Sequence, residues 1–99
     1  MQIKINKLQK ILKIKFNDTD LLIQAITHKS YNSKKNYEIL EFLGDRVLGL
    51  TISNKLIELY PNEKVGILDK RFSNLVNKNT CYDVGKKLKL NEFVLVGNS

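Results

Sequence analysis

A chain of 99 residues with a hydrophobic fraction of 42% has room for one domain and enough apolar side chains for a small core, which excludes wholesale disorder. The net charge of +7 is unevenly placed, because residues 1–36 hold eight lysines against two aspartates, whereas residues 37–60 hold four acids against two basic residues. Such a basic excess suits a polyanionic partner, but it is equally typical of a solvated lysine-rich surface.

The single cysteine, Cys81, excludes an intrachain disulfide and a cysteine-based metal cluster. We expect it to be a small buried apolar residue. The N-terminus alternates charged and apolar residues without a hydrophobic signal core, and no apolar run is long enough to cross a membrane. The composition therefore predicts a soluble, cytoplasmic protein without a membrane partner.

Apolar residues at helical spacing predict the first two elements of the chain. Residues 5–12 form one such pattern, with lysines on the other faces. A second helix is expected to begin at Asn17-Asp18 and to continue to Ile26. Residues 28–36 are polar and turn-prone, which predicts a loop.

The longest predicted helix runs from about Tyr37 to Tyr60, where Pro61 ends the pattern. Its apolar residues spread over most of the circumference, so we expect neighbours to bury it on several sides. Further helices are predicted over residues 65–77 and 80–88, with Val84 and Leu88 inward. The end of the chain, residues 92–97, is apolar and fits a strand or a packed loop. The predicted fold class is all-α.

Three acids, Glu38, Glu41 and Asp45, stand at positions i, i+3 and i+7 of the long predicted helix. This spacing places them on one helix face, within a sector of about 60°. Carboxylates this close repel one another, and Mg²⁺ compensates well because it prefers carboxylate and water oxygens. Alternatively, the acids lie at the solvent edge and pair with lysine, arginine or backbone donors. The acidic stripe alone does not separate these interpretations.

The sequence around the acids resembles the signature of the ribonuclease III family, Glu-Arg-Leu-Glu-Phe-Leu-Gly-Asp. Seven of its eight positions match, at Glu38, Leu40, Glu41, Phe42, Leu43, Gly44 and Asp45. Residues 27–31, Thr-His-Lys-Ser-Tyr, resemble the family's Thr-His-x-Ser motif. Further resemblance to the following helices of bacterial members lies at Leu68, Arg71, 75–76 and 80–81, so that the similarity extends from about Leu8 to Gly97.

This resemblance implies an all-α, homodimeric endoribonuclease domain that cleaves double-stranded RNA during rRNA and mRNA processing, leaving 5′-phosphate and 3′-hydroxyl ends. Its cofactor would be Mg²⁺, with Mn²⁺ as a substitute and no small-molecule cofactor. By matching position, Glu41 and Asp45 would be the catalytic residues and the metal ligands. Asp45 would also help to hold the attacking water, and Glu38 would have a supporting role.

The chain departs from the family pattern in two respects. Ile39 replaces the usual arginine, which removes a possible partner for Glu38 or for RNA. The family completes its metal site with an Asp and a Glu on a later helix, whereas the last acid here is Glu92. A double-stranded-RNA-binding domain is also absent. We therefore expect residues 1–99 to be a single partial catalytic domain, inactive alone, either as a fragment or as a natural truncation.

Two other functions compete with the nuclease hypothesis. A ribonuclease-III-like module could dimerise and hold RNA without cutting it. A carboxylate-bridged helical metal protein is disfavoured because His28 is the only histidine. We interpret His28 as a structural hydrogen-bonding residue. Solvated lysines are expected at positions 34, 35, 86, 87 and 89, and apolar surface is expected at Leu48, Ile52 and Leu56.

Overall fold

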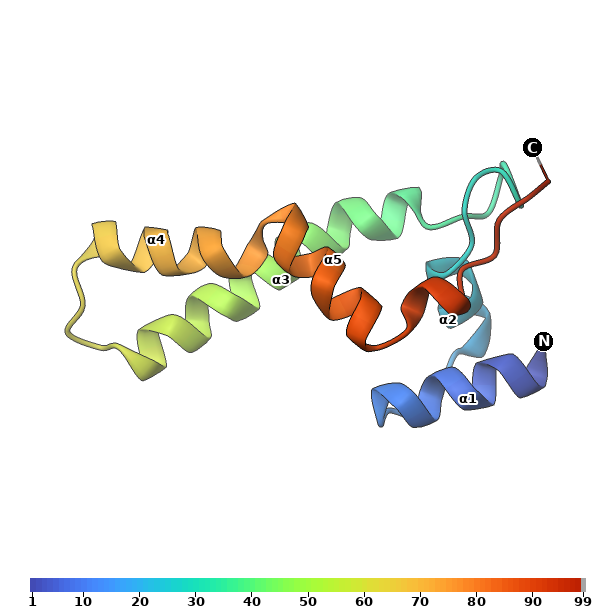
Figure 1. Ribbon diagram of the computed structural model, residues 1–99, viewed down its shortest axis with the longest axis horizontal. Helices are drawn as coiled ribbons and strands as arrows, with labels where there is room; N and C mark the ends of the chain where they lie inside the picture. Colours follow the sequence, from blue (N-terminus) through green and yellow to red (C-terminus); the bar gives the residue numbers. More distant parts are fainter. Residues whose placement is uncertain (99) are drawn as a thin grey trace. The chain divides into compact units, whose positions relative to one another are not determined.

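The computed structural model describes residues 1–98, and its regular elements are helices (Figure 1). In chain order they are α1 (Gln2–Leu12), α2 (Thr19–Ala25), α3 (Glu38–Leu59), α4 (Val65–Val76), α5 (Lys78–Lys87) and the short 3-10 helix η1 (Leu90–Glu92). The β pairing within the described residues is one isolated parallel bridge between Thr27 and Leu95. The prediction of an all-α domain is therefore confirmed. Within residues 1–98, none of the helices combines the length and the hydropathy that a membrane span needs.

The chain divides into two compact units. Unit 1 is Met1–Glu41 together with residues 85–98, and unit 2 is Phe42–Val84. The long helix α3 contributes its first turn to unit 1 and its remaining turns to unit 2.

The core of unit 1 consists of apolar side chains from α1, α2 and the segment that follows η1. Its buried members are Ile5, Leu8, Leu22, Ile26 and Phe93. Ile5 and Leu8 are almost completely enclosed, at 1% and 0% exposure. Ile5 and Leu8 belong to the helical pattern of residues 5–12, and Leu22 and Ile26 to the second helix that the sequence predicted. Burial of each such side chain stabilises the fold by about 1.5–3 kcal/mol.

The start of α2 follows from a capping residue that the sequence had indicated. Asp18 has extended backbone geometry, and its carboxylate accepts a hydrogen bond of 3.1 Å from the backbone N–H of Leu21. This bond satisfies one of the donors that a helix leaves free at its N-terminus. The preceding helix α1 ends at Lys13, which adopts the left-handed conformation with φ of 58°.

The end of the described chain is held against the segment that follows α2. The backbone N–H of Leu95 donates to the carbonyl of Ile26 at 2.8 Å, and the N–H of His28 donates to the carbonyl of Leu95 at 2.9 Å. Further along, the N–H of Gly97 donates to the hydroxyl of Ser30 at 3.0 Å. The apolar end of the sequence is thus a packed loop with one bridge, which is one of the two forms that its composition allowed.

Unit 2 is built on an antiparallel hairpin of α3 and α4, joined at Pro61 as the sequence had predicted (Figure 1). The guanidinium of Arg71 on α4 lies 3.8 Å from the ring centre of Tyr60 and 3.3 Å from the carboxylate of Glu63. These contacts hold the connecting turn against α4 through a cation–π interaction and an ion pair.

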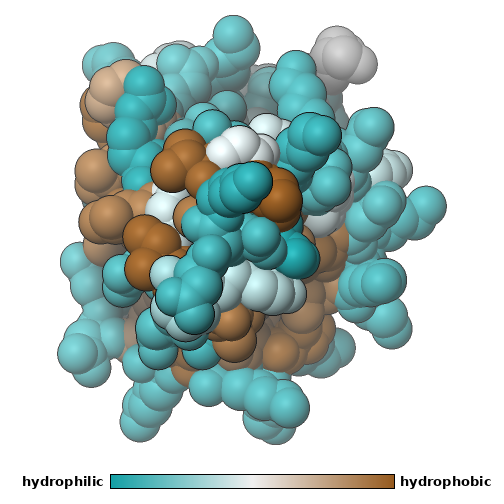
Figure 2. Space-filling view, turned by 90° about the vertical axis from the view of Figure 1, so that its left-hand side faces the viewer, coloured by the Kyte–Doolittle hydropathy of each residue, from teal (hydrophilic) through white to brown (hydrophobic). Residues whose placement is uncertain are grey.

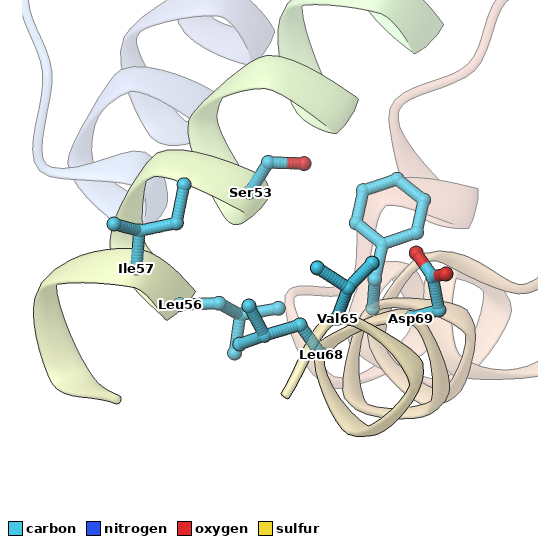
Figure 3. A pocket seen from close by; sticks show the side chains of 7 residues that line it. Ser53, Leu56, Ile57, Val65, Leu68 and Asp69 are labelled. Carbon is cyan, nitrogen blue, oxygen red and sulfur yellow. The ribbon is translucent and has the colours of Figure 1, made fainter. Parts of the chain in front are cut away.

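A groove of about 340 Å³ lies between the two helices of this hairpin (Figure 3). Its walls are mostly apolar, with the Ser53 hydroxyl and the Asp69 carboxylate as polar groups; the remaining lining residues are Leu56, Ile57, Val65, Leu68 and Phe72. Leu56, at 6% exposure, is the one buried residue that α3 contributes.

The expectation that α3 is buried on several sides is wrong for the described residues. Its apolar side chains remain 39–74% exposed at Ile39, Phe42, Leu43, Val47, Leu48, Leu50, Ile57 and Leu59. Apolar side chains also reach the surface at the end of the molecule where α3 and α4 are joined (Figure 2). The physical reason is that α4 covers only one side of α3, near Leu56.

Three smaller expectations about burial also need correction. Leu56 is buried rather than exposed, because it packs in the hairpin. Cys81 is exposed rather than buried, and none of the residues of α5 is buried. Val84 on the same helix is 51% exposed, whereas Leu88 is partly buried. Leu48 is exposed as expected, and Ile52 is partly covered.

Replacement of Gly97 tests how closely the chain end approaches the loop after α2. A Cβ atom at this position would collide with the carbonyl oxygen of Ser30. We expect Gly97→Ala to lower the free energy of unfolding by about 1–3 kcal/mol, because the backbone has to move apart. Thermal and denaturant unfolding would measure the change. Gly66→Ala on α4 is the control: with no atom within 4 Å of its Cβ, it should be neutral or slightly stabilising. Equal unfolding free energies for Gly97→Ala and the unmodified chain would contradict the packing described here.

Candidate active site

The first turn of α3 is fixed by residues that come before it in the sequence. The backbone N–H of Tyr37 donates to the carbonyl of Thr27 at 2.9 Å, and the N–H of Glu38 donates to the side-chain oxygen of Asn36 at 3.0 Å. The amide of Gln24 donates to the carbonyl of Asn36 at 3.1 Å. These bonds satisfy backbone groups around the helix N-terminus and determine where α3 begins.

All three acids of the predicted stripe lie on α3, and all three are exposed. Glu38 and Glu41 are in the first turn, where the positive end of the helix dipole stabilises negative charge by about 0.3–1 kcal/mol each. Asp45 follows one turn later. Because α3 is a continuous helix through these positions, Glu41 neighbours both Glu38 and Asp45, with about 5–6 Å between Cβ atoms.

Of the three carboxylates, Glu38 alone has a charged partner within residues 1–98. Its oxygen lies 3.9 Å from the ammonium nitrogen of Lys29, and both side chains are more than half exposed, at 62% and 68%. An ion pair this open to water contributes little to stability. In the described part of the chain, the carboxylates of Glu41 and Asp45 form no ion pair or hydrogen bond, and both side chains are exposed to solvent. The paired-surface interpretation therefore fits Glu38 better than the other two acids.

The pair formed by Glu41 and Asp45 suits a hard cation that keeps most of its water. Mg²⁺ is commonly bound through one or two carboxylates and retains several waters. In the described residues, no three His, Cys, Asp or Glu side chains come together as a metal cluster. Glu41 and Asp45 could therefore supply part of a magnesium site, with water and other groups completing the coordination.

Ile39 stands where the family signature has an arginine, and another residue provides the positive partner of Glu38. Ile39 is 67% exposed, and Lys29, rather than a residue at position 39, provides the positive partner of Glu38. Arg46, next to Asp45, turns back along α3: it lies 4.0 Å from the ring centre of Phe42 and donates to the carbonyl of Phe42 at 3.0 Å. The arginine charge is thus held on the neighbouring helix face.

The other residues singled out in the sequence lie outside the acidic face. The ring of His28 is hydrogen-bonded to Ser30, with 2.7 Å between Nδ1 and the hydroxyl oxygen, which confirms a structural hydrogen-bonding role. The five lysines at positions 34, 35, 86, 87 and 89 are exposed, as expected. Lys29, Gln24 and Asn36 were not singled out in the sequence. The signal for Asn36 was an asparagine shortly before the predicted helix, because asparagine side chains often accept the backbone N–H two residues further along the chain.

The family profile described as ribonuclease-III-like matches residues 18–99. The chain belongs to this family. It is 55% identical over 92 residues to Ribonuclease 3 of Pelagibacter ubique, an alignment that covers 93% of this chain and 41% of that relative. With Ribonuclease 3 of Bartonella tribocorum the identity is 41% over 98 residues, covering 97% of this chain and 42% of the relative. The chain thus spans about two-fifths of the length of these curated relatives.

The fold is similar to that of a solved member of the family. The nuclease domain of ribonuclease III from Campylobacter jejuni superposes with a TM-score of 0.89 and 39% sequence identity, covering 94% of this chain and 65% of that domain. That domain is described as showing structural flexibility in a region involved in dimer formation. The ribonuclease-III-like fold is therefore shared over nearly all of this chain.

Removal of the Asn36 side chain tests the start of the acidic helix. We expect Asn36→Ala to lower the free energy of unfolding by roughly 0.5–2 kcal/mol, because the N–H of Glu38 loses its acceptor. Hydrogen exchange should accelerate at the amides of Glu38 and its neighbours. The matched control is Asn54→Ala, an exposed position inside α3 where alanine has the higher helix propensity and should stabilise slightly. This role of Asn36 as an acceptor for the Glu38 N–H would be refuted by equal unfolding free energies for Asn36→Ala and the unmodified chain.

Proposed function

We propose that this chain is the front part of an endoribonuclease domain that cleaves double-stranded RNA with Mg²⁺. The observation that carries the proposal is the exposed face of α3, where Glu41 and Asp45 lie within the family signature without protein partners. A ribonuclease-III-like fold with a TM-score of 0.89 to a nuclease domain supports the same activity. Relatives named Ribonuclease 3 support the choice of RNA as substrate.

In this proposal Glu41 and Asp45 hold the metal, and Glu38 supports the site from the preceding turn. A bound Mg²⁺ would lower the pKa of a coordinated water and offset the charge that builds on the phosphate. Asp45 accepts a hydrogen bond from the attacking water and orients its oxygen towards phosphorus. The new P–O bond forms as the bond to the 3′ oxygen breaks, and that oxygen takes up a proton. One product then ends in a 5′-phosphate and the other in a 3′-hydroxyl.

The charge distribution supports a polyanionic substrate. Of the net charge of +7, unit 1 carries +6 and unit 2 carries +1. Lysines contact phosphates without reading base identity, and duplex RNA is recognised mainly by shape, phosphates and 2′-hydroxyls. The family resemblance narrows this polyanion to duplex RNA, and we propose rRNA and mRNA precursors in the cytoplasm as the substrates.

We propose a homodimer as the functional assembly. The exposed apolar side chains of α3, with Leu50 at 74% and Phe42 at 58%, form a surface that a second copy would cover. A dimer region in the Campylobacter jejuni domain supports this assignment. Sedimentation over a dilution series is expected to detect a dimer that dissociates at low concentration; a monomer throughout the series would contradict it.

Cleavage of a labelled RNA duplex tests the proposed activity. The 99-residue chain alone is expected to cut poorly or not at all, because Glu41 and Asp45 leave most of the metal coordination to other groups. A chimera in which residues 1–98 replace the matching segment of the Pelagibacter ubique relative should cut only with Mg²⁺ or Mn²⁺. In that chimera, Asp45→Asn should reduce the rate by roughly two orders of magnitude or more.

The controls distinguish a nuclease from a module that only holds RNA. Asp83→Asn, at an exposed aspartate on α5, makes the same chemical change away from the acidic face and should leave the cleavage rate unchanged. A chimera that binds duplex RNA without cutting it would favour the RNA-holding alternative. Efficient magnesium-dependent cleavage by the 99-residue chain alone would overturn the expectation of an inactive fragment.

A further inference from the structure

The loop of residues 27–30 lies between two segments of unit 1 that are far apart in the sequence. On one side it contacts residues 95–97. Parallel pairing joins Thr27 to Leu95, and the N–H of Gly97 donates to the Ser30 hydroxyl at 3.0 Å. On the other side, the carbonyl of Thr27 accepts the N–H of Tyr37 at 2.9 Å. The loop therefore touches both the end of the described chain and the residue that precedes α3.

The side chain of His28 extends the contact with the start of α3. Its ring lies edge-on to the ring of Tyr37, with 5.8 Å between the ring centres and 63° between the planes. Next to it, Lys29 is the partner of Glu38. The loop thus approaches the first acidic turn through an aromatic contact and an ion pair as well as through the backbone.

Hydrogen bonds inside the loop connect its two sides. The N–H of Ser30 donates to Nδ1 of His28 at 3.1 Å, which ties the ring to the backbone of the same loop. The Ser30 hydroxyl is also hydrogen-bonded to Nδ1, at 2.7 Å, and its oxygen accepts the N–H of Gly97. A continuous path therefore runs from Gly97 through Ser30 and the His28 ring to Tyr37.

The loop is also anchored to the core, so it cannot shift freely. Thr27 is buried at 3% exposure, and its hydroxyl donates to the carbonyl of Ile23 in α2 at 2.6 Å. Because close-packed interiors are nearly incompressible and transmit strain, an anchored loop that contacts two segments fixes their positions relative to one another.

We propose that His28 and Ser30 are positioning residues for the acidic turn of α3. Through the path described above, they couple the placement of residues 95–97 to the placement of Tyr37, Glu38 and Glu41. The coupling itself depends only on contacts within unit 1. Its consequence for metal binding rests on the proposed function, in which Glu41 is a ligand.

Amide hydrogen exchange in the 99-residue chain tests the coupling without any metal. Ser30→Ala removes the acceptor of the Gly97 amide, which should then exchange about fivefold faster. The amides of Tyr37 and Glu41, which are not bonded to Ser30, should also exchange faster. Ser33→Ala makes the same substitution three residues further along the chain, at an exposed serine, and should leave all these amides unchanged.

Two variants of His28 separate the hydrogen bond from the ring contact. His28→Asn keeps an oxygen acceptor near the position of Nδ1 but loses the ring, so it should preserve protection at Gly97 and loosen Tyr37. His28→Phe keeps a ring against Tyr37 but loses the acceptor at Nδ1. The Gly97 amide should therefore be the first to lose its protection from hydrogen exchange.

Manganese then reports on the acidic turn. Mn²⁺ added to the unmodified chain should broaden the amide signals of Glu41 and Asp45, and Ser30→Ala should require a severalfold higher Mn²⁺ concentration for the same effect. If Ser30→Ala loosens Gly97 but leaves Tyr37, Glu41 and the Mn²⁺ response as they were, the proposed coupling is overturned. If exchange behaves as expected but Mn²⁺ broadens neither Glu41 nor Asp45 in the unmodified chain, the coupling stands and the proposed metal site fails.

Discussion

The arrangement of unit 1 depends on the backbone pairing between residues 26–28 and Leu95. Two hydrogen bonds, from Leu95 to Ile26 and from His28 to Leu95, join parts of the chain that are separated by more than sixty residues. Because Phe93 lies two residues before Leu95, the same pairing places its side chain among the buried residues of α1 and α2. The carbonyl of Thr27, within the paired segment, then receives the N–H that precedes α3. One short backbone contact thus organises the core and the start of the acidic helix.

Much of the helical structure could be predicted from local patterns. The helix expected over residues 37–60 is found at Glu38–Leu59, and that expected over 65–77 is found at Val65–Val76. Pro61 and Asp18 mark boundaries through local chemistry, since one cannot continue a helix and the other caps its start. The bridge at Leu95 had no such signal, because pairing across a long sequence separation depends on the assembled core rather than on neighbouring residues.

Burial was predicted less well than helix position, for a physical reason. An apolar helix surface indicates that something covers it, but it does not say whether the cover belongs to the same chain. Phe42 and Leu50 are apolar residues of the kind found in cores, but both are exposed here, whereas Leu56 is enclosed by α4. The acidic face was predictable because Glu38, Glu41 and Asp45 are close in sequence. Its surroundings at Lys29 and Asn36 were not, since they depend on how the loop before α3 folds back.

The division of α3 between the two units has a consequence for the local stability of the acidic face. Unit 1 encloses five apolar side chains, whereas Leu56 is the one buried side chain of the described residues in unit 2. Regions with less buried surface open at a lower free-energy cost, as separate cooperative segments. Glu38 and Glu41 belong to the better-enclosed unit and Asp45 to the other. We therefore expect the turn of α3 that carries Asp45 to open at a lower free-energy cost than the turn that carries Glu38 and Glu41.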